Sequence, residues 1–231
     1  NSVLAKQRLK LAFFPVVTIQ GQGQEQALHQ EGFVRLQAEH DDRWMVAGDF
    51  MPMAVQHKLT ATMDLAVTEY ALAALQTTPG NIAINFCAET ITDWGFRNQL
   101  TRLLDSHPAL CTRLCVEVTE YDALRELEAF RDLARTLKQY GCTIGIDHAG
   151  QQLNQWPQIA DLGLDYLKVD YGFIRGAQQA PGVQEFLAGL CKMAHAMGIK
   201  VIAEGLQEKS ELELLPALGF DGATGPAVGR I

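Results

Sequence analysis

The sequence lacks the features that would place it in a membrane or on long nucleic acid. No apolar run approaches the ~18–20 residues that a membrane-spanning helix needs, and no cleavable signal pattern opens the chain. Basic residues are in the minority, because 19 Lys and Arg stand against 27 Asp and Glu, a formal net charge of −8. A broad cationic surface for long nucleic acid is therefore not expected.

Paired cysteines are also lacking. The five cysteines are odd in number and contain no CxxC pair, which favours buried free thiols in a reducing, cytoplasmic compartment. Only 8 of the 231 residues are proline and 48% are hydrophobic, so the chain can bury a full core without disulfides. We expect one domain over residues 1–231. The chain begins with Asn1 and not with Met, so we expect that it is a piece of a larger protein.

What the sequence does contain is an alternation of strand and helix patterns. Short β-branched runs are each followed by a longer segment with apolar residues three or four apart, which is typical of βα units around a parallel sheet. The predicted strands are residues 11–17, 32–36, 82–86, 114–118, 142–146, 166–169, 200–203 and 220–223. Eight strands in 231 residues favour a TIM-like (βα) barrel, with a doubly wound open sheet as the alternative.

Polar side chains terminate most of these strands. In a barrel the strands that precede helices bring their ends to one rim, where active sites are built. Several carboxylates on one rim cannot all stay charged and desolvated without a cation between them, and Mg²⁺ or Mn²⁺ suits oxygen donors best. The alternative is that each acid is a solvated strand end. The terminating residues are Asn85, Glu117, Asp147, Lys168 with Asp170, and Glu204.

The same residues resemble a known family. The segment Glu31-Gly32-Phe33-Val34-Arg35 is similar to the Glu-Ala-Leu-Leu-Arg signature of EAL domains, which bind and hydrolyse the bacterial second messenger cyclic di-GMP. The resemblance spans nearly the whole chain, and it implies a barrel whose first strand runs against the others, and commonly a homodimer. The motifs that follow in the family's order are Ile84-Asn85-Phe86, Glu117-Val118-Thr119-Glu120, Asp147, Leu167-Lys168-Val169-Asp170 and Ala203-Glu204-Gly205.

The resemblance also implies a role for each matched residue. Lys168 would position and activate the attacking water, and Glu204 would support a second metal or the water network. The family reaction is in-line attack of water on one phosphodiester, which opens the ring to the linear dinucleotide with two metals beside the reacting oxygens. One Mg²⁺ or Mn²⁺ ion would be held by Glu31, Asn85, Glu117 and Asp147. The ligand itself would be contacted by Arg35, Asp170 and Thr224.

Three positions depart from the family pattern. Active members have a second Asp after the one that matches Asp147, as a ligand of the second metal, whereas this chain has His148. A neutral imidazole adds no charge and suits Mg²⁺ poorly, so the second metal site is expected to be lost. The family's Gln before the first-strand proline is Phe14 here, and its late Gln-Gly-Tyr is Thr224-Gly225-Pro226.

These departures favour a receptor over an enzyme. A missing catalytic cation lowers turnover more than ground-state binding. The segments 50–53, 166–175 and 222–229 resemble those of degenerate EAL domains in LapD-type receptors, where a periplasmic sensor, a HAMP relay and a degenerate GGDEF domain precede the EAL domain at the cytoplasmic face of the inner membrane. Because Glu31 and the first metal set are intact, an active phosphodiesterase is the alternative. A third possibility is a docking module that binds no nucleotide.

Overall fold

Short β-branched runs form nine strands in the part of the chain that the structure describes. The structure is a computed structural model and describes residues 8–19, 26–38 and 42–228. Eight strands close into a ring because β1 pairs with both β2 and β9, whereas β3 extends β2 outside the ring. The strands are β1 (Leu9–Thr18), β2 (Ala27–Gln37), β3 (Trp44–Val46), β4 (Ile82–Asn85), β5 (Leu114–Thr119), β6 (Thr143–Ala149), β7 (Tyr166–Val169), β8 (Lys200–Ala203) and β9 (Gly222–Thr224).

The direction of β1 sets it apart from the rest of the ring. It runs antiparallel to both of its neighbours, while β2 and β4 to β9 run parallel to one another in the ring order. This confirms the predicted TIM-like (βα)8 barrel with an antiparallel first strand. The alternative, a doubly wound open sheet, is wrong, because such a sheet would leave two strand edges unpaired.

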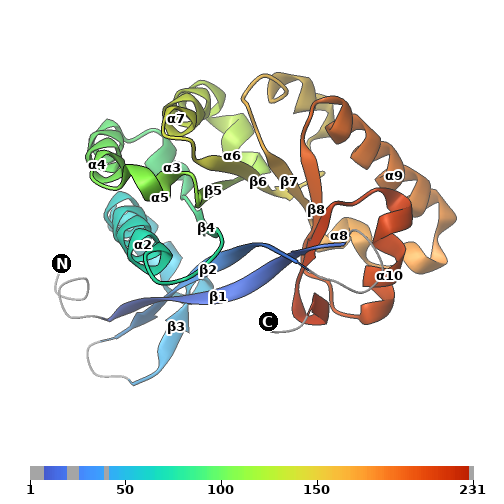
Figure 1. Cartoon of the computed structure of the whole chain (residues 1–231), viewed down its shortest axis with the longest axis horizontal. Helices are drawn as coiled ribbons and strands as arrows, with labels where there is room; N and C mark the ends of the chain where they lie inside the picture. The colour runs from blue at the N-terminus through green and yellow to red at the C-terminus, as the bar shows by residue number, and fades with distance from the viewer. Residues whose placement is uncertain (1–7, 20–25, 39–41, 229–231) are drawn as a thin grey trace.

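Most helices lie in an arc on the outside of the barrel (Figure 1). Apolar ridges on α2, α4, α7 and α9 pack against the outer faces of the strands, as the predicted spacing requires. No described helix has the length and apolar character needed to cross a membrane. The helices are α1 (Ala47–Gln56), α2 (Thr60–Leu75), α3 (Ala88–Ile91), α4 (Trp94–Asp105), α5 (Pro108–Cys111), α6 (Glu120–Arg125), α7 (Leu127–Gln139), α8 (Tyr171–Ile174), α9 (Pro181–Ala196) and α10 (Lys209–Leu218), with 3-10 turns η2 (Leu153–Gln158), η3 (Ala177–Gln179) and η4 (Pro226–Val228).

Alternation along each strand separates the outside of the barrel from its interior. Val116 and Val118 of β5 are fully buried in the main hydrophobic cluster, together with Phe130 and Leu133 of α7. Glu117 lies between the two valines and, because neighbouring residues of a strand face opposite sides, its side chain points into the barrel. One short strand thus both packs against helices and presents a carboxylate to the interior.

The strand β2 begins earlier than predicted. The pattern predicted a strand over 32–36, but the structure extends it over Ala27–Gln37. The polar residues before Glu31 give no hydrophobic signal, yet their backbone pairs with β1, and Gln30 and Glu31 also pair with β4. The early start has one consequence for the site: His29 becomes part of a strand and is buried inside the barrel.

A buried glutamate anchors the loop that leaves β6. Glu120 begins α6 and is 2% exposed. Its carboxylate accepts hydrogen bonds from the backbone N–H groups of Gly150, Gln151 and Gln152 at 3.1, 2.9 and 3.0 Å, and from the Trp156 indole at 2.8 Å. Four donors on one carboxylate hold this loop in a single position beside the rim of the barrel.

A second buried acid joins α2 to the loop after β4. Asp64 accepts hydrogen bonds from the backbone N–H of Cys87 at 2.8 Å and from its thiol at 3.4 Å. Burial raises the pKa of Asp64 from 3.8 to about 6, although the hydrogen bonds from Cys87 oppose this shift. Asp64 therefore favours its protonated form in the folded protein more than in the unfolded chain.

Replacing Glu120 by Gln is expected to lower the free energy of unfolding by about 2–4 kcal/mol, because the amide loses the charge and turns an N–H group towards backbone donors. Urea denaturation measures the loss. Glu128→Gln, on the exposed face of α7, is the matched control. A change below about 0.5 kcal/mol in the Glu120 variant, the usual range for exposed sites, would contradict the anchoring role.

Replacing Asp64 by Asn is expected to change how stability depends on pH. Because the folded pKa lies above the unfolded one, the folded wild type binds more protons between pH ~4 and ~6 and loses stability as pH rises through this window. The rise of the Asp64 pKa from 3.8 to about 6 corresponds to about 3 kcal/mol of stability that the wild type loses between low pH and pH 7. Asn does not titrate, so the variant does not undergo this loss. Urea denaturation of both proteins at several pH values should show the free energy of unfolding of Asp64→Asn rising relative to that of the wild type as pH increases through this window. If the difference in free energy of unfolding between the two proteins does not change with pH, the raised pKa of Asp64 is wrong.

Candidate functional site

The predicted polar residues gather at one rim of the barrel. This rim is formed by the carboxyl ends of the parallel strands, which the closed ring brings together. Asn85 pairs in register with Glu117 on the neighbouring strand, so the two side chains leave the sheet side by side. The residues are Glu31 on β2, Asn85 on β4, Glu117 on β5, Asp147 on β6, Lys168 on β7 and Glu204 directly after β8.

Three carboxylates surround one ammonium group inside this rim. Nζ of Lys168 lies 2.9 Å from Oε1 of Glu31, 3.0 Å from Oε2 of Glu117 and 3.2 Å from Oδ1 of Asp147. All four side chains are buried, and those of Lys168 and Glu117 are 0% exposed. The four groups would carry a net charge of −2 if all were ionised, in a space with little exposure to water.

The pKa values reflect this crowding. Burial raises the pKa of Glu117 to about 8, and it also raises the pKa of Glu31. Burial would raise the pKa of Asp147 too, but the ammonium of Lys168 holds it below its usual value. Lys168 stays charged, because its three carboxylate neighbours outweigh its burial and raise its pKa well above the usual value. One positive charge is therefore not enough to keep all three acids ionised.

The same donors fit a divalent cation. One oxygen each of Glu31, Glu117 and Asp147 lies within 4.8 Å of the others, a separation that a single ion can bridge. Carboxylate oxygens are the donors that Mg²⁺ and Mn²⁺ prefer. An ion with two positive charges would also lower the pKa of Glu117 by stabilising its ionised form.

A β-bulge brings a further side chain to the rim. The pairing of β6 with β7 shifts between Ile146 and Ala149, and His148 in this stretch adopts a left-handed backbone conformation with φ 52°. A bulge re-aims side chains, so His148 reaches acids at the rim, as its neighbour Asp147 does, although different ones. Its Nδ1 lies 3.0 Å from Oδ2 of Asp170 and 3.2 Å from Oε2 of Glu204.

The imidazole of His148 acts as a local positive charge. The carboxylate of Glu204 is the main cause that raises the pKa of His148 to about 9, with burial opposing and Asp147 and Asp170 assisting. His148 is therefore protonated at neutral pH. Asp147, His148 and Glu204 also form a second cluster whose ligand atoms lie within 4.8 Å of one another. The imidazole of His148 thus lies between the carboxylates of Glu204 and Asp170.

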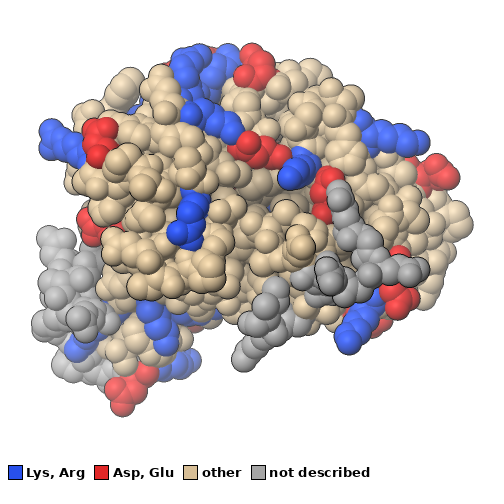
Figure 2. All heavy atoms as spheres, in the orientation of Figure 1, with Lys and Arg blue, Asp and Glu red and all other residues tan. Residues whose placement is uncertain are grey.

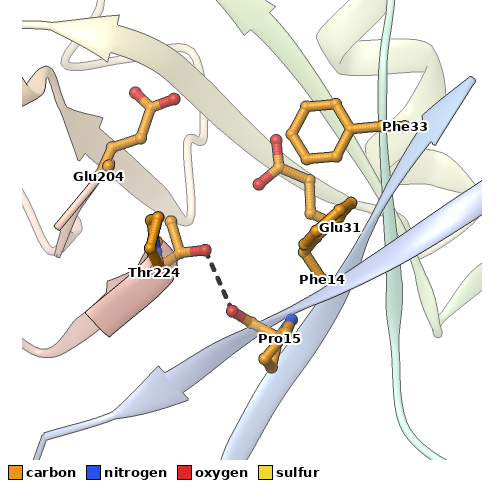
Figure 3. Close-up of a pocket in the computed structure, with 9 residues that line it drawn as sticks. Phe14, Pro15, Glu31, Phe33, Glu204 and Thr224 are labelled. Atoms are coloured by element: carbon orange, nitrogen blue, oxygen red, sulfur yellow. Dashed lines mark hydrogen bonds between the residues drawn. The ribbon is translucent and has the colours of Figure 1, made fainter. Parts of the chain in front are cut away.

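A mostly apolar pocket opens beside the acidic cluster. Figure 3 shows the carboxylates of Glu31 and Glu204 pointing into it from opposite sides, with the ring of Phe33 beside Glu31. The cavity measures about 440 Å³ and is also lined by Phe14 and by Thr224, whose hydroxyl donates to the Pro15 carbonyl at 3.0 Å. Aromatic walls beside charged groups suit a ligand with flat rings and anionic groups.

The remaining predicted residues lie farther from this centre. Arg35 is on the same face of β2 as Glu31, four residues and about 13 Å along the strand, and its guanidinium donates to the Val34 carbonyl. Asp170 caps α8 by accepting from the Gly172 N–H at 2.7 Å. Asn85 faces a separate, smaller cavity between β2, α1 and α2. The structure thus clusters the acids and Lys168, and leaves Arg35 outside the pocket lining.

Two interior residues were missed by the sequence reasoning. The Tyr166 hydroxyl donates to Oε1 of Glu117 at 2.6 Å, and His29 stacks on the Tyr166 ring at 5.2 Å. Tyr166 lies two residues before Lys168 on β7, and His29 lies two residues before Glu31 on β2. The two-residue period of a strand places these pairs on the same face, and this signal could have found both residues.

The outer surface is mixed in charge. On the face shown in Figure 2, acidic and basic side chains are interspersed and large neutral areas lie between them. The described residues of this face therefore form no continuous field of one sign. The concentrated charge of the molecule lies inside the rim.

Comparison with curated proteins relates the chain to enzymes of cyclic dinucleotide signalling. It is 25% identical over 209 residues to the cyclic di-GMP phosphodiesterase PdeF of Escherichia coli K12, covering 88% of this chain and 28% of that protein. It is 26% identical over 187 residues to the cyclic di-GMP phosphodiesterase PA2567 of Pseudomonas aeruginosa, covering 79% of this chain and 32% of that protein. The chain thus spans about a third or less of the length of these relatives.

Solved structures share the fold. A structure described as the PaMucR phosphodiesterase in complex with c-di-GMP aligns with a TM-score of 0.86 at 24% identity, covering 99% of this chain and 94% of that one. The Vibrio cholerae LapD S helix-GGDEF-EAL structure aligns with a TM-score of 0.88 at 18% identity, covering 97% of this chain and 54% of that one. At these identities the likeness concerns the fold alone. The family profile described as EAL domain matches residues 1–230, and the chain therefore belongs to the EAL domain family, the family of the cyclic di-GMP phosphodiesterases.

Proposed function

We propose that this chain is a degenerate EAL domain that acts as a cyclic di-GMP receptor in bacterial signalling, with weak or no hydrolysis. The observation that carries the proposal is the position of His148. Its imidazole lies 3.0 Å from Asp170 and 3.2 Å from Glu204, where the family resemblance expects a carboxylate and a second metal ion. A protonated imidazole repels a cation, so the second ion loses both its ligand and its electrostatic attraction.

Ligand binding depends on parts of the site that His148 does not disturb. Phe14 and Phe33 line the cavity and offer rings on which a guanine base can stack. Arg35 is the candidate for a charge-assisted contact with a phosphate, and Thr224 and Asp170 are candidates for further polar contacts. Relatives with this fold have been solved with cyclic di-GMP, including the FimX EAL domain of Pseudomonas aeruginosa, which supports the choice of ligand.

One divalent ion completes the site in this proposal. Glu31, Asn85, Glu117 and Asp147 would hold Mg²⁺ or Mn²⁺, which when bound supplies Lewis-acid stabilisation of phosphate charge. Lys168 would position and activate the attacking water. Glu204, turned towards His148, would support the water network. The three carboxylates alone would repel an anionic dinucleotide.

The chain would work as one EAL-type domain, residues 1–231, of a larger multidomain protein. The relatives that it matches are much longer than the matched region, and one structure of this fold carries an S helix and a GGDEF domain beside the EAL domain. On the model of LapD-type receptors, we place a sensor, a HAMP relay and a GGDEF domain upstream, at the cytoplasmic face of the inner membrane. The EAL domain would be able to form a homodimer.

An active phosphodiesterase is the second candidate. The observation that favours it is the intact trio of Glu31, Glu117 and Asp147, with oxygens within 4.8 Å of one another, beside Lys168. If one ion with Lys168 is enough for the in-line reaction, the domain would release the linear dinucleotide. The two candidates share the ligand and differ in turnover.

Isothermal titration calorimetry with cyclic di-GMP, in the presence of Mn²⁺, is expected to give a binding signal for the wild type. Replacing Arg35 by Ala should weaken the affinity about 10- to 150-fold, since a hydrogen bond to a charged group contributes about 1.5–3 kcal/mol. Arg135→Ala, on the exposed face of α7, is the matched control and should bind like the wild type. The absence of any heat at about 100 μM ligand would refute the receptor function and favour a docking module without nucleotide.

Replacing His148 by Asp is expected to increase hydrolysis at least about 10-fold, because a second carboxylate restores a binding site for another cation. A tenfold rate change needs only about 1.4 kcal/mol of transition-state stabilisation. Chromatography of the linear product with Mn²⁺ measures the rate. Glu31→Ala should abolish any turnover. If the wild type is as fast as the His148 variant, and both exceed Glu31→Ala, the chain is an active phosphodiesterase and the degenerate assignment is wrong.

A further inference from the structure

The two oxygens of Glu117 meet different surroundings. Oε2 faces the rim, where Nζ of Lys168 lies 3.0 Å away. Oε1 faces the layer of side chains below the rim, which contains Tyr166 and His29, and accepts a hydrogen bond from the Tyr166 hydroxyl at 2.6 Å. Both Tyr166 and Glu117 are buried, at 4% and 0% exposure, so this hydrogen bond is shielded from water and is made to a charged or readily charged acceptor.

The layer below the rim is shaped around the Tyr166 ring. A Cβ atom on Gly145, the paired residue on β6, would come within 2.3 Å of this ring, so only glycine leaves space for it. On the other side His29 stacks on the ring, with centroids 5.2 Å apart and an interplanar angle of 30°. Residues from three strands thus hold the tyrosine in one orientation under Glu117.

In this layer the Tyr166 hydroxyl, and not the His29 imidazole, donates a hydrogen bond to Glu117. Nε2 of His29 lies 3.7 Å from the same Oε1 and makes no hydrogen bond within the described part of the chain. The Tyr166 hydroxyl at 2.6 Å is within hydrogen-bond distance of Oε1, whereas the His29 imidazole at 3.7 Å is not.

We propose that Tyr166 is a positioning residue of the metal site: its hydroxyl holds Oε1 of Glu117 in the lower layer and leaves Oε2 as the one oxygen that Glu117 offers to a divalent cation. Gly145 and His29 hold the tyrosine ring in place for this purpose. The proposal rests on the metal site of the proposed function, because it assumes that Glu117 is a ligand.

The effect of such a residue has a known scale. Side chains that orient metal ligands change metal affinity or activity by about 10- to 100-fold when they are removed. Without the hydroxyl, the Glu117 carboxylate is free to rotate. Fixing it in place on metal binding then costs free energy, and the metal binds more weakly. Tyr166→Phe keeps the ring and its packing and removes only the donor.

Calorimetric titration of the full chain with Mn²⁺, without nucleotide, tests the proposal. Tyr166→Phe is expected to weaken the Mn²⁺ affinity about 10- to 100-fold, and the electron paramagnetic resonance spectrum of the bound Mn²⁺ should change. Tyr140→Phe is the matched control, because the Tyr140 hydroxyl also donates to a carboxylate, Asp105, at 2.7 Å on the surface. This variant should bind Mn²⁺ like the wild type. Thermal melting checks that each variant is folded.

The outcomes separate the two proposals. If the wild type binds no Mn²⁺, the metal site of the proposed function is wrong and the role of Tyr166 falls with it. If the wild type binds and Tyr166→Phe binds equally well, with the same spectrum, the metal site stands and only the positioning role is refuted. Should the variant fail to fold, a crystal structure of the wild type with Mn²⁺ decides: binding through Oε2 alone supports the role, and binding through Oε1 refutes it.

Discussion

The site depends on one electrostatic constraint: three buried carboxylates share a single buried ammonium. Lys168 lies within 3.2 Å of oxygens of Glu31, Glu117 and Asp147, and all four side chains are buried. A buried charge without a partner is strongly destabilising, so the excess negative charge must be relieved by a proton or by a cation. The raised pKa of Glu117 shows that this carboxylate readily takes up a proton. A divalent cation would relieve the same excess charge. The acidic interior therefore destabilises the fold and supplies the donors of the proposed metal site.

A single bulge changes how this constraint is met on one side of the rim. It turns His148 towards Glu204 and Asp170, so an imidazole lies between these two acids. The substitution of His for a carboxylate inverts the local charge. The Glu31 side of the site, which His148 does not reach, keeps its carboxylates. The proposed receptor function follows from this difference between the two sides of the rim, because a site with one ion would hold a ligand better than it cleaves it.

Much of the fold was readable from the sequence because the strands from β4 onwards are short, buried and separated by helices. The acids at the strand ends were predicted for the same reason, since Glu117 stands between two buried valines. Hydrophobic patterns say nothing about a polar strand, so the early start of β2 at Ala27 was missed. They also assume strict alternation, which the bulge at His148 breaks. The contact between Tyr166 and Glu117 joins residues 49 positions apart, and no local pattern reports it.

Counting the metal ions in the liganded protein tests the central claim most directly. Crystals grown with Mn²⁺ and cyclic di-GMP would locate each ion by its anomalous scattering. We predict one ion, bound between Glu31, Glu117 and Asp147, with the imidazole of His148 still between Glu204 and Asp170. A second ion beside His148 and Glu204, or no ion among the three carboxylates, would contradict the account.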